Sequence, residues 1–210
     1  IGVFFVLFYA SISIANVNRV EFRISLLSAL SNNTEIIEFY EENEFKPIWV
    51  GGERSARERR SYFFKELENT SKHALPSVRY DAAYLKNQFR QARTASELGL
   101  IEALITLKFL SYSSNLQTGI LKPASVDKEI VRKVPYRSKS AYLKTFLLVA
   151  PRDFFNGLPP QTKQYSLLLS EKKRLEKIIA QGGWYSELPT ELLRPGDVGD
   201  NVILLRNALI

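Results

Sequence analysis

Residues 94–119 read TASELGLIEALITLKFLSYSSNLQTG and carry the strongest helical pattern in the chain. Thr94 and Glu97 have the spacing of a capping box, which marks the start of a helix. Gly119 is suited to the left-handed conformation that ends many helices, and we assign it a structural role. Apolar residues recur at intervals of three and four, so we expect this helix to be the central element of the core. They are Leu98, Ile101, Ile105, Phe109, Tyr112 and Leu116.

Weaker amphipathic patterns predict helices on both sides of this segment. The first begins at Asn32, which has Glu35 at capping-box distance, and ends before Phe45. Ile48-Trp49-Val50 reads as a short extended run, and residues 153–160 read as a turn-rich connector. We therefore predict an irregular all-α domain of about six helices, with at most one or two very short strands. The other helices cover about residues 55–69, 77–93, 140–149 and 162–181.

The two tryptophans and the single histidine lie where predicted helices end. Trp49 and Trp184 could stack on sugar rings, but we interpret both as structural core residues. His73 precedes Ala74 and is interpreted as a helix-terminal residue. With no cysteine and one histidine in 210 residues, disulfides and thiolate metal sites are excluded, and a catalytic triad is hard to build. We expect no metal site and no cofactor.

The chain is basic, with a formal net charge of +7 and a pI of about 9.5. The basic residues are spread over many segments and interleave with glutamate, which is typical of solvated helix faces. No nucleic-acid-binding motif is present, and we expect no nucleic-acid partner. The excess charge indicates only a general affinity for polyanions, such as anionic cell-wall polymers or lipid headgroups.

The first fifteen residues, IGVFFVLFYASISIA, carry no charge and resemble the apolar core of a secretory signal peptide. Ser13 and Ala15 have the spacing of a signal-peptidase site, which would leave Asn16 as the first mature residue. The initiator methionine and the basic segment that begins such peptides are missing, so we expect the sequence to be truncated at its start. A membrane anchor that brings residues 1–15 into contact with the bilayer and a buried core helix are the alternatives.

The last residues predict the beginning of a second domain. Pro195-Gly196 and Gly199 lead into a short helix with Val202, Leu205 and Leu209 on one face. A helix of two to three turns is marginal alone, because helix nucleation is costly. We therefore divide the chain into a leader or anchor at 1–15, a helical domain at 16–190 and an incomplete domain at 191–210.

Three segments in order resemble the N-terminal scaffold region of the large periplasmic L,D-transpeptidases, which cross-link murein. They are residues 39–49, 97–123 and 159–184. Residues 193–209 look like the first helix of a three-helix peptidoglycan-binding domain. The chain departs from the family at Ala74, where relatives often have glycine after the histidine.

The resemblance implies an exported, periplasmic protein that takes part in peptidoglycan biosynthesis and cell-wall organisation. Family members use a cysteine thiolate, activated by a histidine, to attack a stem peptide. Because this chain has no cysteine, the resemblance implies a catalytic domain beyond residue 210 and no transferase activity from these residues alone. Peptidoglycan would be bound through the downstream domains. The candidate substrate-binding residues are Arg194, Asp197 and Arg206, since they could contact carboxylates or amides of glycan strands. The simpler interpretation is that these three are ordinary turn and surface residues.

A second hypothesis needs no enzyme. A basic helical adaptor could bind anionic cell-wall polymers or a membrane surface through its excess charge. The oligomeric state is open under both hypotheses.

Overall fold

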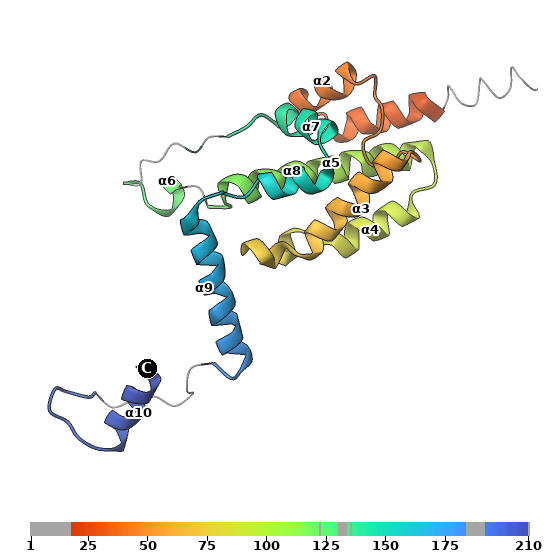
Figure 1. Cartoon of the computed structure of the whole chain (residues 1–210). Coiled ribbons are helices and arrows are strands. Elements are labelled where there is room, and N and C mark those ends of the chain that lie inside the picture. The colour runs from red at the N-terminus through yellow and green to blue at the C-terminus, as the bar shows by residue number, and fades with distance from the viewer. Residues whose placement is uncertain (1–17, 122, 130–133, 135, 184–191, 210) are drawn as a thin grey trace, which may run out of the picture. The chain divides into compact units, whose positions relative to one another are not determined.

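The computed structural model describes residues 18–121, 123–129, 134, 136–183 and 192–209 (Figure 1). These residues form helices, turns and irregular segments with no strand among them, so the predicted all-α class is confirmed. The chain divides into two units, Ile1–Pro160 and Gln161–Ile210. The predicted leader, residues 1–15, and Trp184 lie outside the described residues.

Helix α5 (Ala95–Thr118) is the long central helix of the first unit. The predicted capping box is confirmed, because Thr94 Oγ1 accepts the amide of Glu97 at 3.2 Å and Glu97 Oε2 accepts the amide of Thr94 at 3.0 Å. Gly119 follows the helix with a φ of +85°, a conformation that suits glycine. The buried residues of α5 include Ile101, Ile105, Phe109, Leu110, Tyr112 and Leu116.

The other helices of this unit pack around α5. Helix α5 contacts α4 (Ala82–Gln91) and α7 (Lys139–Leu148). Figure 1 shows α3 (Arg54–Glu68) beside α4, and α3 also contacts α8 (Pro151–Gly157). Helix α7 further contacts α2 (Thr34–Glu42) and α8. The remaining short helices are η1 (Thr70–His73), η2 (Ser77–Arg79) and α6 (Pro123–Val126).

An aromatic cluster joins α3, α5, α7 and α8. The fully buried Trp49 ring lies 5.3 Å from the ring centroid of Phe63, 5.3 Å from that of Phe109 and 5.4 Å from that of Phe146. Phe155 of α8 stacks on Phe63 at 6.0 Å. Such pairs stabilise a fold by about 0.5–1.5 kcal/mol each beyond the area that they bury. The cluster therefore fixes α3 and α8 against α5.

Two predictions of local structure are wrong. Residues 153–160, expected to be a connector, belong mostly to α8, because Pro151 occupies a first-turn position where its missing N–H costs nothing. The helix expected over 77–93 is interrupted after η2, and α4 starts anew at Ala82 behind its cap Asp81, whose carboxylate accepts the Tyr84 amide at 2.8 Å.

The predicted cap of the first helix is also wrong. Helix α2 follows Asn33 rather than Asn32, and no side chain caps it. Glu35 instead accepts the backbone amide of Ser140 at 2.9 Å, and Lys139 donates to Asn33 Oδ1 at 2.6 Å. These contacts hold the start of α7 against α2. Residues 48–50, expected to be extended, form a bend.

Residues 18–29 form a helix that the pattern analysis does not predict. Leu26 and Leu30 are fully buried, and Ser25 Oγ lies 2.6 Å from Ser96 Oγ of α5. A Cβ added to Gly99 would lie only 2.4 Å from the carbonyl oxygen of Phe22. Gly99 therefore permits the close approach of this helix to α5. No helix among the described residues is both long and apolar enough to cross a bilayer.

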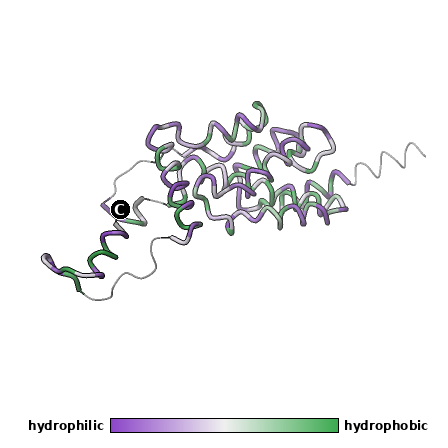
Figure 2. The backbone as a smooth tube through the Cα atoms, turned by 60° about the horizontal axis from the view of Figure 1, so that its bottom comes forward, coloured by the Kyte–Doolittle hydropathy of each residue, from purple (hydrophilic) through white to green (hydrophobic). Residues whose placement is uncertain are grey.

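The second unit contains α9 (Lys163–Ala180) and α10 (Asp200–Leu209). Thr162 caps α9 by accepting the Tyr165 amide at 3.2 Å. Figure 2 shows hydrophobic and hydrophilic residues alternating along the helices, the pattern of amphipathic helices. None of the side chains of α9 is buried, and Leu168 and Ile179 are exposed.

Candidate functional site

A buried carboxylate of α5 organises the loop that precedes α3. Glu102 is fully buried and accepts the backbone amides of Ile48 at 2.6 Å, Trp49 at 3.1 Å and Val50 at 3.0 Å. It also accepts the hydroxyl of Tyr40 at 2.8 Å. Burial raises the pKa of Glu102, and the hydrogen bonds oppose that effect. Since buried polar groups are favourable only when paired, the carboxylate and these donors require one another.

Thr106 lies one helical turn beyond Glu102 and completes this network. Its hydroxyl oxygen lies 2.7 Å from the Tyr40 hydroxyl and accepts the Trp49 indole N–H at 2.9 Å. Burial, followed by the charge of Glu102, raises the pKa of Tyr40 well above its ordinary value. The side chains of Tyr40 and Trp49 can therefore be fully buried while the hydroxyl and the indole N–H keep their hydrogen bonds.

Helix α3 holds the same loop from its other side. Arg59 Nε donates to the carbonyl of Ile48 at 3.2 Å, and Arg60 donates to the carbonyl of Trp49. Burial lowers the pKa of both guanidinium groups, and attraction to Glu102 opposes this. The backbone amides of the loop thus donate to Glu102 of α5, while two backbone carbonyls of the loop accept from arginines of α3. This arrangement fixes the rotation of α3 about its own axis.

The opposite, exposed side of α3 separates two open grooves. Arg57, Ser61 and Lys65 recur every four residues, are exposed, and line both grooves. Each groove has a volume of about 610 Å³. The groove toward α8 is also lined by Arg54, Glu58, Tyr62, Ala150, Pro151 and Arg152. The groove toward α4 is also lined by Arg60, Phe64, Glu68, Lys86, Phe89 and Arg90.

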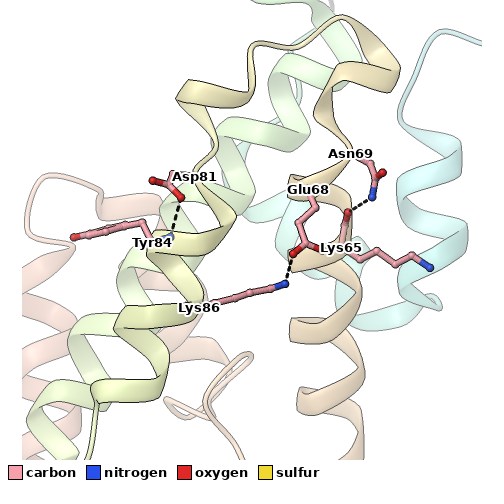
Figure 3. A network of polar contacts seen from close by, with 6 residues as sticks. All are labelled: Lys65, Glu68, Asn69, Asp81, Tyr84 and Lys86. Atoms are coloured by element: carbon pink, nitrogen blue, oxygen red, sulfur yellow. Dashed lines mark hydrogen bonds and ion pairs between the residues drawn. The ribbon is translucent and has the colours of Figure 1, made fainter.

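The lining of the two grooves is strongly basic. It comprises seven basic and two acidic side chains, a net of +5 compared with +7 for the whole chain. Glu58 pairs with Arg54 at 2.7 Å, and Glu68 pairs with Lys86. In Figure 3 the side chain of Lys65 extends away from the second pair. The basic residues that are dispersed in the sequence are therefore gathered in space.

Among the described residues, five of the seven cations take part in no ion pair, and one of these five, Arg60, donates instead to the carbonyl of Trp49. Within the described part of the chain, no ion pair involves Arg57, Lys65, Arg90 or Arg152. Close by, Tyr62 has a raised pKa, caused first by burial and then by the charge of Glu66. The grooves thus present unneutralised positive charge beside aromatic surface.

The residues predicted to bind substrate lie in the second unit. The Arg194 amide donates to Asp197 Oδ2 at 2.7 Å within a turn that contains Gly196, so the structure brings these two residues together. Arg206 lies on α10, and no hydrogen bond or ion pair connects it with either residue among those described. All three are exposed.

The other residues singled out by the sequence lie in the first unit. Trp49 is buried in the aromatic cluster, and Gly119 ends α5. His73 ends η1, and burial, followed by the charge of Lys72, lowers its pKa. Ala74 adopts the left-handed conformation, with φ +57°. No group of three or more His, Cys, Asp or Glu side chains in the described residues could hold a metal ion.

Sequence reasoning missed the role of Glu102, although a signal for it exists. Glu102 lies four residues after Leu98 and three before Ile105, within the apolar stripe of α5. A carboxylate in such a position requires buried donors, and neither their identity nor their position follows from the local pattern. The grooves were missed because they combine residues of α3, α4 and α8.

A family model described as Scaffold domain matches residues 34–171. The match begins at the first residue of α2 and includes the Glu102 network and both grooves. No curated protein and no solved structure matches the chain. Because the matched span covers more than half of the 210 residues, the chain belongs to the Scaffold domain family.

Proposed function

We propose that this chain is the non-catalytic scaffold portion of an exported L,D-transpeptidase that cross-links murein. The observation that carries the proposal is the Scaffold family match over residues 34–171. The transpeptidase context rests on the resemblance of residues 39–49, 97–123 and 159–184 to that enzyme class. Fold and family alone do not define an activity, so the context needs its own test.

The chemistry of the chain is consistent with a supporting role. A cysteine nucleophile cannot come from these residues, since the sequence contains no cysteine. The structure offers instead a helical body in which residues 48–50, in the loop before α3, are hydrogen-bonded to α5 through their amides and to α3 through the carbonyls of residues 48 and 49. A rigid body of this kind suits the positioning of a catalytic domain.

Export and peptidoglycan binding belong to the same proposal. Residues 1–15 would act as the export signal or as an anchor, and the protein would function in the periplasm. The turn with Arg194 and Asp197, together with Arg206, would begin a peptidoglycan-binding domain. Peptidoglycan would then be the main partner of the complete protein.

The coding sequence downstream of the Ile210 codon provides the test. An open frame that continues into a domain with a Ser/His-x-Gly-Cys segment is the expected result, because it would supply the thiolate that this chain lacks. A stop codon directly after Ile210, or a downstream domain without cysteine, would contradict the proposal. Either result would favour the basic adaptor.

A further inference from the structure

We propose that the two grooves beside α3 bind a carboxylate-bearing murein strand directly. The scaffold would then contact the polymer itself, rather than only supporting domains that do so. The choice of murein rests on the function proposed above, whereas the choice of an anionic, partly apolar strand rests on the grooves.

The charge of the grooves specifies an anion. Arg57, Arg152, Lys65 and Arg90 have no ion-pair partner among the described residues, and all four are exposed. The planar guanidinium group matches a carboxylate with two parallel hydrogen bonds. Carboxylates of stem peptides fit this chemistry.

The apolar part of the lining favours a glycopeptide over a bare phosphate polymer. Tyr62, Ala150 and Pro151 line the groove toward α8, where Tyr62 is half-buried and Ala150 is exposed. Methyl groups and sugar faces can pack on such surfaces, while arginine and lysine bind the carboxylates between them. A polyphosphate backbone offers no comparable apolar groups.

The arrangement of the grooves fits an extended ligand. Arg57, Ser61 and Lys65 line both grooves and form the ridge of α3 that separates them. A strand that crosses this ridge would lie in both grooves and contact all three residues. Arg59 and Arg60 hold α3 to the buried loop. Arg60 also lies over the Phe89 ring, 4.0 Å from its centroid. The ridge is therefore presented in a fixed orientation before the ligand arrives.

Co-sedimentation of the full 210-residue chain with purified murein sacculi tests the inference. Arg57→Glu, Lys65→Glu and Arg152→Glu, combined in one variant, should weaken retention about tenfold or more, since three attractions become repulsions. Retention of the unaltered chain should also fall as salt is raised. Circular dichroism checks that the variant is folded, which we expect because the three side chains are exposed.

A matched variant separates a specific site from overall charge. Arg19→Glu, Lys163→Glu and Lys173→Glu change the net charge by the same amount at exposed positions outside the grooves. This variant should be retained about as well as the unaltered chain. Equal loss in both variants, or loss in neither, would overturn the inference.

The identity of the ligand is tested separately. Amidating the carboxylates of the sacculi with ethanolamine should abolish retention, and undiminished retention would contradict carboxylate recognition. Groove-dependent binding to anionic phospholipid vesicles or to single-stranded DNA, without binding to sacculi, would assign the grooves to another polyanion and overturn the inference. A downstream cysteine domain without groove-dependent retention would leave the proposed function intact and remove only this inference.

Discussion

Glu102 Oε1 lies 2.6 Å from the backbone nitrogen of Ile48, although 54 residues separate them in the sequence. The same carboxylate accepts two further consecutive amides, so one side chain of α5 fixes the loop that leads into α3. Through Arg59 and Arg60 this loop in turn orients the basic ridge of α3. The buried carboxylate of Glu102 and the exposed cations Arg57 and Lys65 therefore belong to one arrangement.

Replacing Glu102 with Gln should destabilise the domain by about 2–4 kcal/mol, because the amide NH₂ group would face N–H donors that the carboxylate now satisfies. Urea unfolding of both proteins measures the difference. Glu41→Gln on the exposed face of α2 is the control and should change stability by less than about 0.5 kcal/mol. Similar effects of the two substitutions would show that the network adds little.

Replacing Gly99 with Ala should destabilise the domain by about 1–3 kcal/mol, despite the higher helix propensity of alanine. The new methyl group would lie 2.4 Å from the carbonyl oxygen of Phe22, so the helix over 18–29 would have to move. Thermal unfolding measures the effect. Gly157→Ala, where a Cβ meets no atom within 4 Å, should be neutral or stabilising. An unchanged melting temperature for Gly99→Ala would place the two helices farther apart than described.

Replacing Ala74 with Gly should stabilise the protein by about 0.5–1 kcal/mol. Ala74 has a φ of +57°, which costs a residue with a Cβ about 1–2 kcal/mol, and glycine's greater freedom when unfolded offsets part of this gain. Differential scanning calorimetry should show a higher melting temperature. Ala83→Gly, at an exposed position inside α4, should lower it instead. A decrease with both substitutions would be inconsistent with a left-handed Ala74.

The contact between Glu35 and Ser140 should make stability depend on pH. Burial alone would raise the pKa of Glu35, but the amides of Ser140 and Lys139, together with the Lys139 charge, lower it below its ordinary value of 4.5. A lowered folded-state pKa adds stability above the unfolded pKa, and that stability disappears as the pH falls through the folded-state value. The stability difference between the protein and its Glu35→Gln variant should therefore be largest near neutral pH and shrink below pH 4.5. Urea unfolding across this range measures it, and a difference that grows toward acid would contradict the contact.

The central helix could be predicted from the sequence because the signals for it lie close together in the chain. The Thr94–Glu97 box and the three-four apolar spacing lie within one segment, and both appear in the structure. In contrast, α8 was missed because its proline, asparagine and glycine resemble a turn, while its stability comes from Phe154 and Phe155 in the aromatic cluster. Tertiary packing, rather than the local sequence pattern, therefore makes this segment helical.

The candidate site was less accessible to sequence reasoning than the fold. Glu35 was interpreted as a cap of its own helix and instead binds the start of α7, more than 100 residues away. The basic residues alternated with glutamate along α3, which suggested a solvated face. Lys86 and Arg90 of α4 and Arg152 of α8 line the same grooves as the basic residues of α3, which becomes visible only in the folded structure.

The central claim is that these residues support a murein-cross-linking enzyme without performing its chemistry. Its most direct test incubates murein with the product of the complete gene and, separately, with the 210-residue chain, and then separates the muropeptides by chromatography. The account predicts new L,D cross-links with the complete product and none with the chain alone, because the chain has no cysteine. Cross-linking by the chain alone, or none by the complete product, would contradict it.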